Sequence, residues 1–293
     1  MHKRRPELLR AVRADYARAR ACATPAAHPL IRSPARTLPA YEMLVDKGVA
    51  NSKQSPLKCL ASSTMGGCFV GMAGLLSMAI AGGMPGVAST NPGLVKLMFA
   101  ALFPVNLLLV LQTGGQLFTG NTCTMSAAYC EGKVTKDQVA RNWAVSYVGN
   151  IIGCGLIALA TSYTGLLTLG TAELAASTVV KKCGSSFGQT VVKAVLCNWL
   201  VCLAVFLATS ARDLTGKMVG IWFPISTFVA IGFEHSVANM FILPLGLLAA
   251  APLTLRQVVL QNLIPVTLGN ILAGALLMGA GLSFLHGKLG EDK

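Results

Sequence analysis

The stretch GFEHSVANMF, residues 232–241, places a glutamate and a histidine inside an apolar run that extends from Met218 to Leu255. An ionisable side chain at bilayer depth is energetically costly, so it usually marks a functional site in a membrane protein. The alternative for His235 is a side chain held by hydrogen bonds in a packed interior. The remaining sequence decides between these two interpretations.

The distribution of charge identifies the chain as a membrane protein. Of its 293 residues, 54% are hydrophobic and only 12% are charged, whereas soluble domains carry about 25% charged residues. Segments without Lys, Arg, Asp or Glu cover residues 59–95, 97–130, 142–172, 194–211 and 257–287. A spanning helix needs about 20 apolar residues, and the alternating segments of an outer-membrane barrel are absent. We therefore predict an all-α membrane protein.

Much of the net charge of +13 lies in residues 1–40, which hold nine Lys or Arg and two acidic residues. This arm has no apolar core, so it is not a secretory signal, and its Arg-rich composition is typical of an organellar transit peptide. A disordered cytoplasmic tail is the alternative. Few aromatic residues accompany the positive charges, so we expect no nucleic-acid partner. We predict a basic disordered arm at 1–40, a six-span domain at 41–287 and a short tail at 288–293.

Two of the six expected spans have polar and glycine residues at their centres. The expected spans are residues 57–81, 97–130, 142–163, 189–209, 218–251 and 258–285, with a polar connection at 164–188. The runs at 97–130 and 218–251 are too long for one straight helix. A break at bilayer depth is tolerated only where it is buried in protein or lines a cavity. The second and fifth spans are therefore predicted to stop and restart.

The two halves of the chain share a sequence pattern. Asn142 and the GNI motif at 149–151 match Asn262 and the GNI motif at 269–271, and Gly120-Asn121 matches Ala238-Asn239. Each half holds three spans, so the second half must be inverted in the membrane. Inverted repeats with interrupted helices indicate a pathway near the midplane. The alternative is chance recurrence of small residues and Asn in helix packing.

Three motifs resemble the signature regions of the formate/nitrite transporter family: LFTGN at 117–121, CNWLVC at 197–202 and GFEHSVANMF at 232–241. The resemblance covers about residues 41–285 and is strongest to algal plastid members, which implies the chloroplast envelope, with the plasma membrane as the alternative. It also implies an aquaporin-like fold, with six transmembrane helices in a three-plus-three inverted repeat and interrupted second and fifth helices. The expected assembly is a homopentamer in the lipid bilayer with one pore per protomer.

The resemblance further implies a set of pore residues. The residues implied for the pore and proton relay are His235, Thr119, Asn198 and Lys182. The neighbouring Lys181 is the alternative to Lys182 as the vestibule lysine. Those implied for two apolar constrictions are Phe103, Leu107, Leu117, Phe118 and Phe228. Supporting roles fall to Glu234, on the far side of its helix, and to Asn121 and Asn239. Taken alone, the apolar residues are consistent with ordinary packing, Lys182 with a solvated loop and Asn198 with interhelical hydrogen bonding.

These residues suit the passage of a small monovalent anion. An unpaired charge cannot cross a dry apolar gate cheaply, so Lys182 would attract the anion and His235 would supply a hydrogen bond or a proton. Helices restarting at Gly120-Asn121 and Ala238-Asn239 would direct backbone N–H groups at the same centre. We expect a channel or transporter for nitrite, formate or bicarbonate. An aquaporin-like channel for neutral solutes is the alternative, although the chain lacks Asn-Pro-Ala boxes.

An enzyme is not expected. The chain has no H-E-x-x-H motif and no second central histidine. Its nine cysteines form no C-x-x-C pair and no Cys/His cluster at zinc spacing. We therefore expect neither a metal nor another cofactor.

Overall fold

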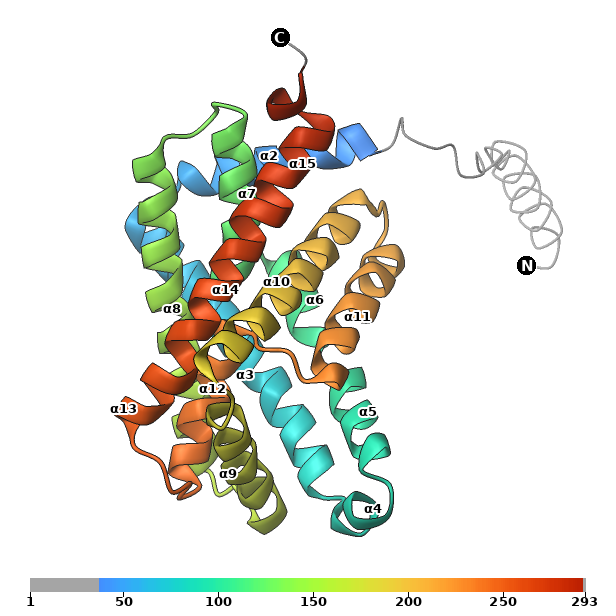
Figure 1. The fold of residues 1–293 in the computed structure, drawn as a ribbon, viewed down its shortest axis with the longest axis vertical. Coiled ribbons are helices and arrows are strands. Elements are labelled where there is room, and N and C mark those ends of the chain that lie inside the picture. The colour runs from blue at the N-terminus through green and yellow to red at the C-terminus, as the bar shows by residue number, and fades with distance from the viewer. Residues whose placement is uncertain (1–36, 292–293) are drawn as a thin grey trace, which may run out of the picture. The chain divides into compact units, whose positions relative to one another are not determined.

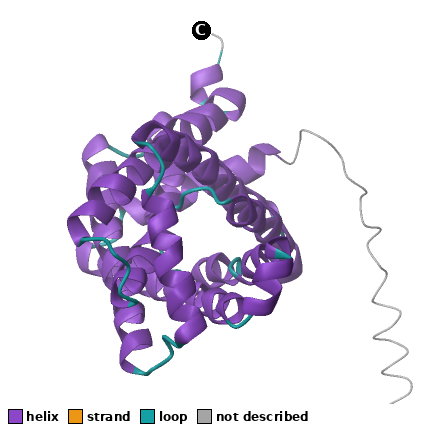
Figure 2. Ribbon diagram, turned by 60° about the horizontal axis from the view of Figure 1, so that its bottom comes forward, coloured by secondary structure: helices purple, strands orange, loops and turns teal. Residues whose placement is uncertain are grey.

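The computed structural model describes residues 37–291, which form helices joined by short loops and no strands (Figure 2). The predicted arm at 1–40 lies outside the described residues except for its last four positions, where α2 begins at Thr37 rather than at Tyr41. The helices, in chain order, are α2 (Thr37–Ser52), α3 (Pro56–Gly82), α4 (Pro85–Thr90), α5 (Pro92–Leu102), α6 (Val105–Thr113), α7 (Phe118–Cys130), α8 (Lys136–Tyr163), α9 (Leu169–Cys183), α10 (Phe187–Ser210), α11 (Leu214–Ile231), α12 (Ser236–Leu248), α13 (Leu255–Val258), α14 (Ile264–Leu272) and α15 (Gly281–His286).

Within the described residues, six helices are long and apolar enough to cross a membrane. The second and fifth spans are completed by the shorter helices α7 and α12 after a break, as the sequence predicts. The sixth span runs from Leu255 to His286 and contains two π-helical segments, Val259–Leu263 and Ala273–Ala280, that the sequence did not indicate. The polar connection at 164–188 contains the helix α9, which the sequence analysis treated as a loop.

Equivalent helices of the two halves begin with the same kind of N-cap residue. Ser55 caps α3 and Ser186 caps α10, the first helix of each half. Thr135 and Thr254 form capping boxes at the start of the third span of each half. A hydroxyl at the N-cap satisfies backbone N–H groups that have no partner within the helix. The inverted repeat therefore extends to the helix ends.

Glycines allow the first and third spans of each half to cross closely. A side chain at Gly149 of α8 would collide with the Leu60 carbonyl of α3, and one at Gly269 of α14 would collide with the Val191 carbonyl of α10. Small residues let backbones approach in this way where helices pack in a membrane. The recurring glycine of the GNI motif is thus explained by the same contact in both halves.

A carboxylate joins both ends of the described chain at the end of the bundle where α2 lies against α7 and α15 (Figure 1). Glu131 accepts hydrogen bonds from the Tyr41 and Ser283 hydroxyls, both at 2.6 Å, and from the Lys288 backbone N–H at 3.2 Å. Partial burial raises the pKa of the Glu131 carboxyl, but these hydrogen bonds outweigh burial and hold its pKa below the ordinary value. Above that pKa, Glu131 fastens α2 to the bundle.

Candidate functional site

Two extended segments interrupt the helices at equivalent places in the repeat. Gly114 and Gly232 end α6 and α11 in the left-handed conformation, with φ of 79° and 87°, which glycine adopts without strain. The chain then passes through an extended residue, Leu117 in the first half and His235 in the second, before the next helix begins. Leucine and histidine therefore occupy matching positions of the two halves.

Two asparagines hold these segments in place. Asn150 accepts a hydrogen bond from the Phe118 N–H and donates to the carbonyls of Ser63 and Gln116. Asn270 does the same for the second half, accepting from the Ser236 N–H and donating to the Ala194 and Glu234 carbonyls. Buried backbone groups without partners are costly, so each asparagine stabilises one break. Both asparagines belong to the GNI motifs. The motifs revealed the repeat in the sequence, but they did not indicate that the asparagines hydrogen-bond the extended segments.

The hydrogen bonds of His235 define its protonation state. The ring is buried, and Nδ1 accepts the Ala238 backbone N–H at 3.1 Å, which makes His235 the N-cap of α12. A neutral imidazole has one donor and one acceptor nitrogen, so the proton lies on Nε2. Nε2 faces the Thr119 hydroxyl at 2.9 Å, the partner expected for it. Protonating Nδ1 would break the helix cap, so the geometry favours a neutral histidine with Nε2–H as donor.

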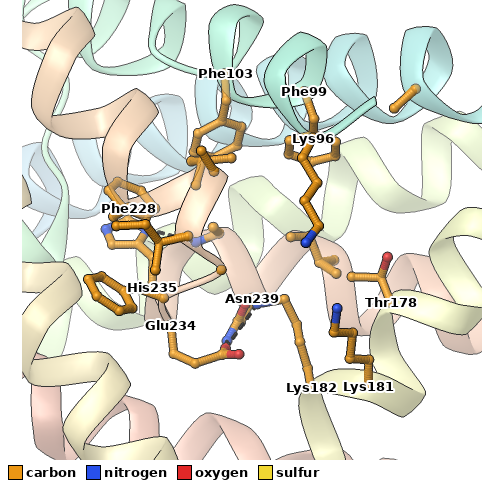
Figure 3. A pocket seen from close by; sticks show the side chains of 18 of the residues that line it. Lys96, Phe99, Phe103, Thr178, Lys181, Lys182, Phe228, Glu234, His235 and Asn239 are labelled. Carbon is orange, nitrogen blue, oxygen red and sulfur yellow. Dashed lines mark hydrogen bonds and ion pairs between the residues drawn. The ribbon is translucent and has the colours of Figure 1, made fainter. Parts of the chain in front are cut away.

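A charged network lies beside His235 (Figure 3). Glu234 Oε2 accepts from Lys182 Nζ at 2.9 Å, from Asn239 at 2.8 Å and from Asn262 at 3.3 Å. The predicted position of Glu234 on the far side of its helix is wrong, because Glu234 lines the same cavity as His235 and Lys182. The chain is extended at His235, and the helical spacing assumed for these neighbours does not apply there.

The equivalent network in the first half is neutral. Gln116 stands where Glu234 stands, and its Oε1 accepts from Asn121 at 2.8 Å and from Asn142 at 3.2 Å. Its Nε2 donates to the Gln54 side chain at 2.8 Å, whereas the equivalent Glu234 is paired with Lys182. The two halves therefore share a fold but differ in charge.

A cavity of about 490 Å³ forms a vestibule in front of His235. Lys182, Glu234, Phe103 and Phe228 also line it. The rings of Phe103 and Phe228 meet edge to face, with centroids 6.5 Å apart, and Phe228 lies 5.6 Å from the His235 ring. The two phenylalanines therefore lie together at the inner end of the vestibule.

Beyond the phenylalanines lies a second cavity of only about 10 Å³, about the space of one water molecule. Leu107 and Leu117 line it, together with His235 and Asn106, which the sequence analysis did not single out. The Asn106 amide donates to the Phe103 carbonyl. The space around His235 is thus narrow and largely apolar on one side and wide and charged on the other.

Two expected pore residues lie elsewhere. Phe118 lines neither cavity; it is the first residue of α7 and packs against Tyr147, with ring centroids 4.9 Å apart. Asn198 lines neither cavity, and its amide donates to the Asn270 carbonyl at 2.6 Å. The helices restart at Phe118 and Ser236, so Gly120-Asn121 and Ala238-Asn239 lie within the first turn rather than before it.

The sequence profile of the formate/nitrite transporter family matches residues 39–284. This chain belongs to the formate/nitrite transporter family. The probable formate transporter of Methanothermobacter thermautotrophicus is 42% identical over 263 residues, which cover 84% of this chain and 93% of that protein. The formate channel FocA of Escherichia coli (strain K12) is 33% identical over 263 residues, covering 80% and 88%.

Solved structures show the same fold. A structure titled FNT family ion channel superposes with a TM-score of 0.75 at 30% identity, covering 84% of this chain and 98% of that one. A pentameric formate channel with formate bound gives a TM-score of 0.70 at 28% identity, covering 80% and 98%. The chain is therefore an integral, multi-pass membrane protein with the aquaporin-like three-plus-three fold predicted from its sequence, and its relatives are transporters and channels.

Proposed function

We propose that this protein conducts small monovalent anions, formate first among them, along the path from the vestibule past His235. One observation carries the proposal. The Nε2–H donor of His235 stands where a wide, lysine-lined vestibule meets a narrow apolar cavity. Formate also fits the printed names of relatives and the ligand of a similar solved structure.

The mechanism follows from the cost of charge in an apolar space. An anion in the vestibule is attracted by the lysines, but crossing the small cavity as a bare charge would be prohibitive. The single Nε2–H of the neutral histidine exchanges its Thr119 acceptor for the anion, and so gives the anion one strong hydrogen bond without trapping it as an ion pair. The anion therefore takes up a proton from water in the vestibule and crosses as the neutral acid. His235 orients and stabilises it while the Ala238 N–H at Nδ1 holds the ring in place.

The roles of the surrounding residues follow from their contacts. Phe103, Phe228, Leu107 and Leu117 exclude water from the crossing. Lys182 and Glu234 keep the vestibule polar up to His235, while Asn239 and Asn121 secure the two networks. We further propose a homopentamer, supported by the pentameric solved relative, and a chloroplast envelope location, supported by the Arg-rich arm. Nitrite and bicarbonate are the other candidate substrates.

Flux into proteoliposomes tests the proposal. Purified protein is expected to accelerate formate uptake, increasingly so as the pH of the outer solution falls, because more neutral acid forms. Nitrite and bicarbonate are measured in parallel, and glycerol serves as the neutral solute. The Lys182→Ala variant is expected to slow anion uptake. If the protein carries glycerol but none of the three anions, it is a neutral-solute channel and the proposal is wrong.

A further inference from the structure

The vestibule carries more positive charge than the passage of a monovalent anion requires. Four lysines and one glutamate line it, a net excess of three positive charges: Lys96, Lys181, Lys182, Lys193 and Glu234. Two of the lysines are already engaged. Lys182 pairs with Glu234 at 2.9 Å, and Lys193 donates to the Ser185 hydroxyl at 2.8 Å. Lys193 keeps its charge but is held against the wall by Ser185, so Lys96 and Lys181 are the two charged lysines left to face the cavity.

Lys96 and Lys181 lie on different walls of the vestibule and point toward one another across it (Figure 3). Lys96 belongs to α5, and Lys181 to the last turn of α9. Among residues 37–291 the ion pairs are Lys133–Asp46 and Lys182–Glu234, so neither of these two lysines has an acidic partner there. Thr178, one turn before Lys181, lines the same wall and adds a hydroxyl.

Two facing ammonium groups match an anion of charge −2 better than one of charge −1, because Coulomb attraction scales with the product of the charges. Such an anion cannot follow the path proposed for formate. A single proton leaves it charged, and the apolar cavity beyond Phe103 and Phe228 has room for about one water molecule. A doubly charged oxyanion would therefore bind at the mouth and stay there.

We propose that Lys96 and Lys181 form a binding site for doubly charged oxyanions at the mouth of the vestibule, and that an anion bound there blocks the pathway. The site rests on the vestibule of the proposed function, but binding to it does not require transport. Sulfate is a suitable probe, because it stays doubly charged through the neutral pH range and is too large for the inner cavity.

Calorimetric titration of the purified protein with sulfate tests the site directly, with sodium chloride at equal ionic strength as the reference. Sulfate is expected to bind, and the Lys96→Gln/Lys181→Gln variant is expected to weaken its binding at least tenfold. The Lys53→Gln/Lys136→Gln variant removes the same charge from exposed lysines outside the vestibule and is expected to bind sulfate within twofold of the unmodified protein. Melting curves of all three proteins verify that the variants are folded.

Proteoliposomes test the block. Sulfate outside is expected to slow formate uptake in the unmodified protein and in Lys53→Gln/Lys136→Gln, but not in Lys96→Gln/Lys181→Gln. Sulfate binding that both double variants retain equally would overturn the inference, as would sulfate that crosses the membrane. If sulfate binds through Lys96 and Lys181 while no anion is carried, the proposed function is wrong and the site stands.

Discussion

Replacing His235 with serine separates its two roles, which are to cap the N-terminus of α12 and to supply a hydrogen-bond donor in the proposed pathway. Serine is a good N-cap residue, so its hydroxyl can accept the Ala238 N–H that Nδ1 accepts now. It is too short to reach the position of Nε2 beside Thr119. His235→Ser therefore keeps the start of α12 and removes the donor from the pathway, whereas His235→Ala removes both.

The magnitudes follow from the contacts. Loss of the cap makes His235→Ala less stable than His235→Ser by about 1 kcal/mol. Both variants leave the buried Thr119 hydroxyl without its 2.9 Å partner. A hydrogen bond to a charged group contributes about 1.5–3 kcal/mol, and each 1.4 kcal/mol is a tenfold change in rate. Formate flux in His235→Ser is therefore expected to fall roughly tenfold to a hundredfold.

The assay is formate uptake into proteoliposomes over a range of outer pH, with melting temperature as the control for folding. The neutral state of His235 predicts that the flux of His235→Ser falls at every pH while its pH profile keeps its shape, because protonation of formate sets the profile. Unchanged flux would refute the role of the Nε2 donor. A shifted profile would show that the imidazole itself titrates during transport.

Three further predictions concern the scaffold. Asn270→Ala leaves the buried Ser236 N–H and Glu234 carbonyl without their partners, each costing about 1–3 kcal/mol, so expression and melting temperature should fall sharply, whereas an unchanged melting temperature would contradict the assigned contacts. Gly274→Ala places a methyl group against Thr122 and should lower the melting temperature, while Gly155→Ala, where a methyl group meets open space, should not. The anchor at Glu131, whose pKa is lowered, should hold at neutral pH and loosen only in acid, as the pH falls through that lowered pKa. Hydrogen exchange in α2 should then quicken in acid, and Glu131→Gln, which has no such titration, should remove that pH dependence.

The architecture was largely predictable from composition and spacing. Long segments without charge required membrane spans, because an unpaired charge in lipid is costly, and the GNI and Asn matches showed the repeat. The two breaks were predicted from the glycine and polar residues at the centres of the long runs, and in the structure Gly114 and Gly232 end the helices there, since few other residues tolerate a positive φ. The helix α9 was missed because its sequence lies in a polar connection, where helix and loop have similar composition.

The pore residues were predictable only in part. His235, Phe103 and Phe228 line the same cavity and Thr119 contacts the His235 ring, whereas Phe118 packs against Tyr147 and Asn198 bonds to a backbone carbonyl. Sequence spacing places a residue on an element, and within an extended segment it does not say which way the side chain points. The vestibule lysines Lys96 and Lys181 were likewise invisible as a pair, since 85 residues separate them in the chain.

Local sequence specifies a six-span helical protein with two matching halves and interrupted helices, because hydrophobic length and the conformational demands of glycine are local properties. The difference in charge between the halves depends on tertiary packing. Folding places Gln116 among neutral amides and Glu234 against Lys182, and it sets Leu117 in the place that corresponds to His235. These pairings join residues far apart in the chain, and their electrostatic consequence arises only when the two halves pack together.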